Sequence, residues 1–319
     1  MQIKKVYAID FIKALACILI FLYHCNTILP GEWKFLTFFG QDMGNNLFFM
    51  VSGFALMPGI VKTPRQKAFF WYLKRLKRIL PMTLIAYIAS YLTGYYSFKD
   101  PAQLFAVFIY PTLYWFITAI LVFYVLLFIL TKLISAKIRI FICLALAVLY
   151  ILRIENADRL YVIGFLAMLT GYMVREALEK NTARFSGAEG FALLVAVLIY
   201  AAGKVFELSY VDHILSGILI LVGVISVGSL ALFIGFHLQE KTGKEIGTGL
   251  HKAIKYIGDM ALPLYLVQCF HSGAIGFYLS RNVKFPLSFL INFVIVWSVG
   301  SLLLLIDALI SGFILKKTH

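Results

Sequence analysis

The first hydrophobic segment of the chain carries three side chains that could do chemistry inside a membrane. Asp10, Lys13 and His24 all fall within the apolar stretch from Tyr7 to Leu29. On an α-helix with about 100° per residue, Lys13 and His24 differ by roughly 20° around the axis and by roughly 16 Å along it. Charged and titratable side chains are costly in hydrocarbon unless they are paired or hydrated. The spacing therefore predicts one polar helix face that leads inward from the membrane edge and carries a histidine, the side chain that titrates nearest to neutral pH.

Each of these residues also has a purely structural interpretation. His24 could be a helix-packing residue that hydrogen-bonds a backbone carbonyl or a hydroxyl. Asp10 and Lys13, three residues apart, could form an ion pair near the start of the helix, where the helix dipole favours a carboxylate. The residues alone leave both interpretations open.

The composition is typical of a polytopic membrane protein. The chain is 62% hydrophobic and 14% charged, and its apolar runs of about 20 residues are each long enough to span a bilayer. We predict an all-α polytopic membrane protein with about ten transmembrane helices in a single bundle, and one integral-membrane domain over residues 1–319 without a separate soluble domain. The predicted spans are Val6–Leu29, Gly40–Ile60, Ile79–Ser97, Tyr114–Thr131, Ile138–Ile154, Leu160–Glu176, Gly190–Phe206, His213–Phe236, Ile254–Leu279 and Pro286–Leu315. Between the third and fourth, Pro101–Leu113 is apolar but too short to span, which predicts an interfacial or re-entrant piece.

The formal charge of +14 follows this topology. With the N-terminus inside, the cytoplasmic segments hold three times as many lysines and arginines as the outer segments, so the positive-inside rule predicts both termini in the cytoplasm. We therefore expect a multi-pass protein of the cell membrane, in contact with lipid and without a nucleic-acid partner. The four cysteines and the histidines show no metal-ligand spacing, so no metal site is expected.

The most basic segment follows the second predicted helix and includes Lys74, Arg75 and Arg78. Positive-inside anchoring and attraction to anionic lipid would account for part of its charge. Seven basic residues in one short loop exceed what orientation requires. Arg75 and Arg78, one turn apart on a helix, could form a fork for the phosphates of a cytosolic cofactor.

Other polar and aromatic residues could line a site within the bundle. Asn45, Asn46 and Ser52 of the second helix could serve helix packing or face a cavity beside the first helix. Trp115 belongs to a group of aromatic residues at the outer face, where an interfacial belt is the default and sugar stacking the functional alternative. Asp307 must face the bundle interior, where pairing with Lys13 or an arginine of the second loop is the favoured interpretation.

Taken in order, these motifs resemble the acyltransferase-3 family of bacterial membrane proteins, which acylate carbohydrates. The first is Asp-x-x-basic-x10-His at residues 10–24, followed by FFMVSGF at 48–54 and Arg-x-x-Arg at 75–78. A late GDMALPLYLVQ follows at 258–268. The resemblance spans the whole chain, and the predicted number of helices fits it.

The resemblance implies roles for the matching residues. His24 matches the catalytic histidine and Asp10 the acid of the opening motif, while Ser52 matches the SGF element. Arg75 and Arg78 match the cytoplasmic arginine pair. The donor in such proteins is usually acetyl-CoA and the acceptor a sugar hydroxyl. Lys13 would join the two arginines in binding the donor, as would Lys74, which precedes Arg75 in the sequence.

The chain departs from the family pattern at three positions. Lys13 stands where the family usually has arginine, so it keeps the charge and loses the planar fork. The late motif usually ends in Tyr-Leu-x-His, whereas here Gln268 takes the last place and His271 comes three residues later. Ala261 replaces the usual serine. Whether His271 substitutes for the missing histidine is left open.

We therefore expect a membrane-embedded O-acyltransferase with neutral His24 as general base. The donor would be cytosolic acetyl-CoA and the acceptor a cell-surface glycan or lipid-linked saccharide. Asn45, Asn46 or Ser52 would supply an oxyanion donor. The alternatives are a transporter or flippase of a lipid-linked saccharide without acyl transfer, which the missing inverted repeats disfavour, and acyl transfer to an antibiotic or peptide.

Overall fold

The computed structural model describes residues 7–92, 115–152, 159–179, 187–205, 213–242, 248–271 and 274–316. All regular elements within these ranges are helices. They are α1 (Tyr7–His24), η1 (Gly31–Trp33), α2 (Phe35–Lys62), η2 (Arg65–Lys67), α3 (Ala68–Leu92), α5 (Trp115–Leu133), α6 (Ala136–Leu152), α7 (Arg159–Glu179), α8 (Gly187–Val205), α9 (His213–Thr242), α10 (Thr248–Asp259), α11 (Ala261–His271), α12 (Ala274–Asn282) and α13 (Leu287–Lys316).

The fold is that of an α-helical membrane protein, as the sequence predicts. Within the described residues, five stretches are long and apolar enough to cross a bilayer. These are Met43–Lys62, Trp115–Leu133, Arg159–Glu179, Ile214–Leu232 and Leu287–Leu309. The count of ten spans, the single-domain description and the cytoplasmic termini stay predictions, and Pro101–Leu113 lies outside the described residues.

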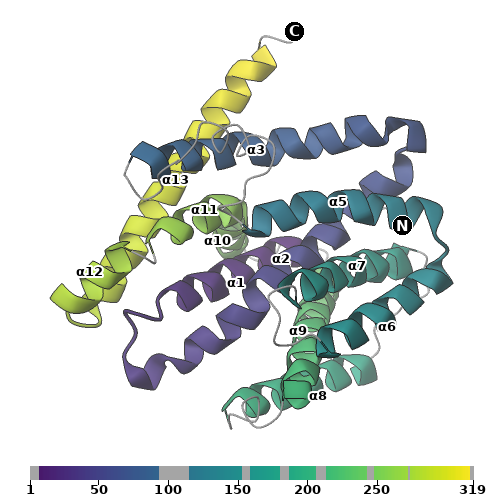
Figure 1. Ribbon diagram of the computed structural model, residues 1–319, viewed down its shortest axis with the longest axis horizontal. Helices are drawn as coiled ribbons and strands as arrows, with labels where there is room; N and C mark the ends of the chain where they lie inside the picture. Colours follow the sequence, from purple (N-terminus) through teal and green to yellow (C-terminus); the bar gives the residue numbers. More distant parts are fainter. Residues whose placement is uncertain are drawn as a thin grey trace.

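The centre of the molecule is an antiparallel pair, α1 and α2, with α7 packed on the other side of α2 (Figure 1). Glycines make the close approaches possible. A Cβ on Gly44 would lie 2.3 Å from the side chain of Ile20 in α1. A Cβ on Gly53 would lie 1.8 Å from the carbonyl oxygen of Met168, and one on Gly171 would lie 1.9 Å from that of Met50. Because backbones approach closely only at small residues, these glycines hold α2 in place between its neighbours.

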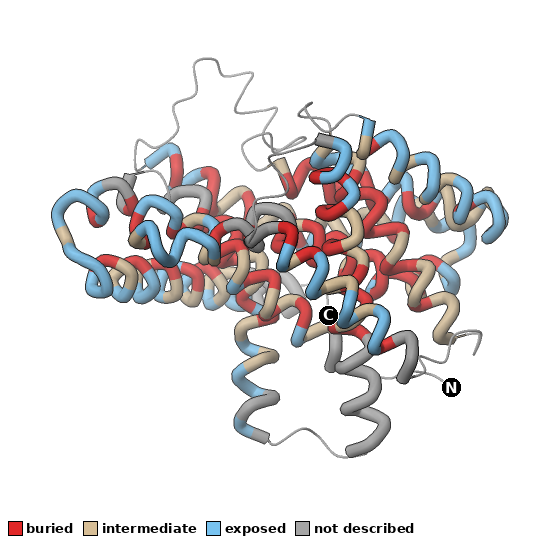
Figure 2. Tube along the Cα trace, turned by 90° about the horizontal axis from the view of Figure 1, so that it is seen from below, coloured by how far each residue is buried: buried red, intermediate tan, exposed pale blue. Residues whose placement is uncertain are grey.

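Buried residues concentrate along the centre of the bundle, and exposed ones lie along the outer helices (Figure 2). Phe49 is fully buried, and its ring lies 4.6 Å from Phe116 and 5.1 Å from Phe123 of α5. Apolar side chains on the outer helices are exposed in large numbers, as expected for surfaces that face lipid rather than water.

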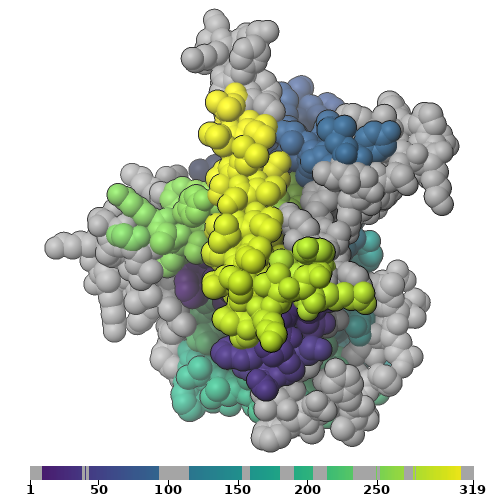
Figure 3. All heavy atoms as spheres, turned by 90° about the vertical axis from the view of Figure 1, so that its left-hand side faces the viewer, coloured from purple at the N-terminus to yellow at the C-terminus, as the bar shows by residue number. Residues whose placement is uncertain are grey.

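The face seen in Figure 3 is covered by α13, with α12 across one end of it. Phe21 of α1 makes edge contacts to Phe289, Phe293 and Trp297 of α13 at 5.6–5.7 Å. Aromatic pairs at this separation contribute about 0.5–1.5 kcal/mol beyond the area that they bury. This contact fixes α13 against the second half of α1.

The predicted helix over Ile254–Leu279 is wrong, because the structure divides this stretch among α10, α11 and α12. Pro263 has no N–H to donate to the carbonyl of Asp259, so a continuous helix would lose that bond. The chain turns at Met260, and the amide of Leu264 then donates to the Met260 carbonyl at 2.8 Å. This break places the Gly258–Asp259 end of α10 and the start of α11 beside α1.

Other helix boundaries also differ, and two of these differences bear on the site. The first helix ends at His24 rather than Leu29, and the next residues form turns before Pro30. The third begins at Ala68, so Lys74, Arg75, Lys77 and Arg78 belong to α3 rather than to a preceding loop. His24 therefore lies at the end of its helix, and Arg75 and Arg78 lie on a rigid one.

Candidate active site

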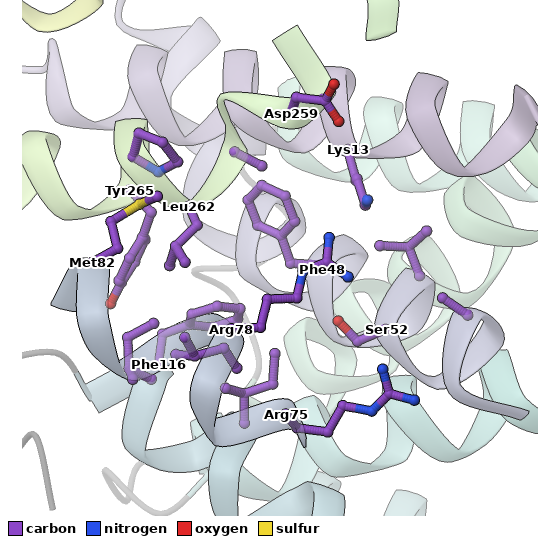
Figure 4. Close-up of a pocket in the computed structure, with 18 of the residues that line it drawn as sticks. Lys13, Phe48, Ser52, Arg75, Arg78, Met82, Phe116, Asp259, Leu262 and Tyr265 are labelled. Carbon is purple, nitrogen blue, oxygen red and sulfur yellow. The ribbon is translucent and has the colours of Figure 1, made fainter. Parts of the chain in front are cut away.

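A cavity of about 460 Å³ lies where α1, α2, α3, α5, α11 and α13 meet, with the end of α10 forming part of its wall. Small-molecule sites typically measure about 300–1,000 Å³. Figure 4 shows its lining residues: basic groups and Ser52 gather toward one side, and apolar and aromatic groups toward the other. The cavity therefore has a basic end and an apolar end.

Three basic side chains from two helices form the basic end. Lys13 comes from α1, and Arg75 and Arg78 come from one face of α3. Arg78 extends toward Lys13 (Figure 4), and the two are close enough to interact electrostatically. Like charges gathered in a partly buried site repel one another, which favours binding of an anion between them.

Arg75 lies against the indole of Trp71, with its guanidinium carbon 5.2 Å from the ring centroid. Its Nε is buried and has no hydrogen-bond partner among the described residues. A buried, unsatisfied guanidinium N–H costs free energy, and a phosphate oxygen is a ligand that would remove this cost. Stacking on Trp71 restricts the orientation of this donor.

Two carboxylates also line the cavity. Asp307 of α13 interacts electrostatically with Arg78, and its pairing with a specific cation stays a prediction. Asp259, at the end of α10, forms an ion pair with Lys255 and also acts on Lys13. Three cations and two carboxylates leave the cavity lining with one net positive charge, so the site suits an anionic ligand.

Ser52 lies on the wall between the two ends, and its hydroxyl hydrogen-bonds Tyr124 of α5. The neighbouring Gly53 packs directly on the backbone of α7. The SGF element thus combines both interpretations from the sequence, because its glycine serves packing and its serine faces the cavity.

The apolar end is closed by side chains from four helices, with Tyr265 and Phe116 at its limit (Figure 4). The ring of Phe116 lies 5.0 Å from Tyr265 and 6.0 Å from Phe48. We call Phe48, Phe116 and Tyr265 the aromatic layer.

The end of α10 reaches the cavity because of a glycine. A Cβ on Gly258 would lie 3.1 Å from the backbone oxygen of Asp10 and 3.4 Å from the Cβ of Lys13. The close fit brings α10 against the first half of α1. The GDMALPLYL motif therefore supplies a packing glycine, an acid and the start of α11 to one wall.

The cavity unites only part of the predicted site. It brings together Lys13, Ser52, Arg75 and Arg78. Asp10 lies half-buried behind the wall, where it interacts electrostatically with Lys13, and Lys74 is exposed on α3 outside the lining.

The remaining predicted residues do not line this cavity. His24 is half-buried at the end of α1, with its ring 5.3 Å from that of Tyr23. Asn45 and Asn46 lie on α2 beyond Phe48, and Trp115 starts α5 within a group of aromatic rings that includes Phe49 and Tyr161. His271 is the last residue of α11, and its side chain lies outside the described part of the structure.

No role was predicted for Tyr124 or Asp259, which line the cavity, or for the side chain of Gln268. Asp259 lies within the late motif, and that motif could have indicated it as a site residue. Tyr124 lies within a long apolar run, where no sequence pattern indicates a site residue. Gln268 is 2% exposed, and neither of its amide atoms has a hydrogen-bond partner among the described residues.

Fold and site together define a helical membrane protein with a basic, partly apolar cavity among its helices. The family model of an acyltransferase domain matches residues 6–311, nearly the whole chain. The chain therefore belongs to this acyltransferase-3 family, which confirms the resemblance seen in its motifs. Searches of the curated proteins and of the solved structures found no match.

Proposed function

We propose that this membrane acyltransferase transfers an acyl group, most simply acetyl, from cytosolic acyl-CoA to a hydroxyl of a cell-surface glycan or lipid-linked saccharide in the cell membrane. The observation that carries the proposal is the cavity at which Lys13, Arg75 and Arg78 converge. Its basic end suits the phosphates of CoA, and its apolar end suits an uncharged acyl arm. Family membership supplies the reaction class.

The basic residues of the cavity fit the negative charge of an acyl-CoA donor. Arg75 and Arg78 would hold phosphate oxygens, with Lys13 as a further cation. Lys74, exposed on the same helix, would attract the nucleotide from the cytosol without entering the cavity. The cavity is too small for the whole of CoA, so the nucleotide would stay at its mouth and the thioester arm would extend along α1 toward His24.

His24 would act as the general base, with Asp10 supporting the charge of Lys13 on the same helix. The acceptor oxygen forms a bond to the thioester carbonyl carbon, the carbon–sulfur bond breaks, and the hydroxyl proton passes through His24 to the departing thiolate. Burial in a helix bundle disfavours the charged imidazolium and so favours a neutral base. Ser52, Asn45 and Asn46 are the candidate donors to the oxyanion, and Trp115 is a candidate for stacking on a sugar.

Release of CoA thiol tests the reaction. Purified protein in detergent would be incubated with acetyl-CoA and a high concentration of methyl glucoside or N-acetylglucosamine, and free thiol would be followed. We expect His24→Ala to lower the rate by about 10²–10⁴-fold, because general acid–base catalysis contributes that factor, while the Kd for CoA stays within about twofold. Equal rates for wild type and His24→Ala would refute the catalytic assignment. Transport without acyl transfer predicts no thiol release by either protein.

Binding of CoA tests the donor site separately. Losing one charge-assisted hydrogen bond of about 1.5–3 kcal/mol should raise the Kd about 10- to 100-fold, so Arg78→Ala and Arg75→Ala should each have this effect by calorimetry. Lys77→Ala is the matched control, because Lys77 carries the same charge on α3 but is exposed and absent from the cavity lining. Pantetheine, which lacks the nucleotide phosphates, should bind wild type and Arg78→Ala alike. If all three variants bind CoA as wild type does, the phosphate assignment is wrong.

A further inference from the structure

Gln268 presents a buried amide that the fold leaves unsatisfied. Both of its polar atoms are buried without a hydrogen-bond partner within the described part of the chain, as is the Oδ1 atom of Asn45 in α2. Buried amide groups are nearly always hydrogen-bonded, so each exception calls for an explanation. Neither residue lines the basic cavity.

The register of three helices places both amides on the His24 side of the aromatic layer. Gly44 contacts Ile20, whereas Ser52 shares the cavity with Lys13, so α2 runs antiparallel to α1. The part of α1 that runs from Lys13 to His24 therefore lies beside the part of α2 that runs back from Ser52 past Phe48 to Asn45.

The start of α11 lies near Lys13, because Gly258 packs there. At Phe285 the chain lies near the opposite end of α1, because the ring of Phe285 lies 6.3 Å from that of Trp33. Moving along α11 from Ala261 past Tyr265 to Gln268 therefore follows α1 toward His24.

Asn45 precedes Phe48 by three residues, and Gln268 follows Tyr265 by three. Residues three apart share a helix face, so the two amides continue the faces that carry the aromatic layer. His24 lies on nearly the same face of α1 as Lys13. This register places the three side chains on the same side of the aromatic layer, away from the basic end of the cavity.

We propose that Asn45 and Gln268 form an uncharged amide site beside His24 that hydrogen-bonds the hydroxyl region of a neutral acceptor. The inference rests on the proposed function. It adds that the acceptor binds on the His24 side of the aromatic layer, whereas the phosphates of the donor bind on the other side.

The chemistry of the amides selects the acceptor class. A side-chain amide both donates and accepts hydrogen bonds, and so does a hydroxyl group. Neither Asn45 nor Gln268 carries a charge, and Asn292, which donates to the sulfur of Cys25 nearby at 3.4 Å, is also neutral. The described cations of the cavity lie beyond the aromatic layer. A phosphate or carboxylate on the acceptor would be desolvated here without a counter-charge, so the site favours unmodified sugar hydroxyls.

Gln268→Met tests the proposal, because methionine keeps the length and flexibility of the side chain and removes its amide. We expect kcat/KM for transfer from acetyl-CoA to methyl glucoside to fall about 10²-fold, the usual effect of losing a donor at the reacting group, with the Kd for CoA unchanged. The melting temperature of the ligand-free protein should rise or stay level, because an unsatisfied buried amide has been removed. Asn282→Leu is the control: its amide is bonded to the Tyr278 carbonyl at an exposed position, so transfer should be unchanged.

The outcomes separate the two proposals. If wild type releases thiol faster than His24→Ala but Gln268→Met matches wild type, the amide site is wrong and the proposed function stands. If Gln268→Met lowers both activity and melting temperature, the amide has a structural role and the inference fails. Glucose 6-phosphate used as efficiently as methyl glucoside would overturn the neutral-acceptor claim. No thiol release by wild type would defeat the proposed function itself.

Discussion

At the scale of single residues, the balance of charges among the lining side chains characterises the cavity better than any one side chain does. Lys13, Arg75 and Arg78 converge from two helices, and the carboxylates of Asp259 and Asp307 oppose them. The carboxylates reduce repulsion among the cations in the empty cavity. The same carboxylates would weaken binding of a polyphosphate ligand, so they set an upper limit on donor affinity.

Replacing Asp307 with asparagine should therefore tighten CoA binding. Removing one negative charge about 8–10 Å from a bound phosphate is worth on the order of tenfold in Kd at an effective dielectric constant near 20. Calorimetry at low and high salt would measure this, and the gain should shrink at high salt. Glu32→Gln, an exposed carboxylate outside the cavity, should leave the Kd unchanged. Weaker binding by Asp307→Asn would show that the carboxylate positions Arg78 instead.

At the scale of helices, glycine contacts decide where the functional side chains end up. Gly53 and Gly171 let α2 and α7 touch through their backbones, and Gly258 does the same for α10 against α1. Ser52 faces the cavity because its neighbour is pressed into α7. The break at Met260 sets the direction of α11, whose Tyr265 contacts Phe116.

Gly53→Ala should lower stability and activity together. Its Cβ would lie 1.8 Å from the Met168 carbonyl oxygen, so the helices must separate, and overpacking of this kind costs about 1–3 kcal/mol. A lower melting temperature in detergent, with a higher KM for acetyl-CoA, is the expected result. Gly249→Ala is the matched control in α10, since nothing lies within 4 Å of its added Cβ, and alanine should raise stability by up to about 1 kcal/mol. Equal melting temperatures for wild type and Gly53→Ala would refute the packing role.

At the scale of the whole molecule, the basic cavity and the loop around Trp33 lie at opposite ends of α1. The cavity is lined by α3, the most basic helix, whereas the chain around Trp33 packs on Phe285 at the opposite end of α1. The positive-inside rule assigns the first end to the cytosol. Donor and acceptor could then approach from opposite sides and meet near His24.

Cysteine labelling from each side would test this orientation. Lys67→Cys and Lys34→Cys both place a thiol at an exposed position. A membrane-impermeant maleimide should label Lys34→Cys in intact cells and Lys67→Cys only in inside-out vesicles. Among the native cysteines, Cys17 and Cys25 are buried and Cys143 is partly buried, and the unsubstituted protein controls for any labelling of the native thiols. The reverse labelling pattern would invert the topology and with it the cytosolic donor.

The sequence by itself determined the helical membrane class and the polar face of the first helix, because hydrophobic length and helical period are local properties of a chain. Its ordered motifs also determined the family, which the whole-chain match confirms. Local patterns could not show that Lys13, Arg75, Arg78 and Asp307 share one cavity or that Asp10 and Lys74 lie outside its lining. They also did not show the helix break at Met260, or that the buried amide of Gln268 has no hydrogen-bond partner among the described residues. Only the tertiary structure decided these points, because they depend on contacts between helices far apart in the sequence, set by where glycines and aromatic rings allow the helices to meet.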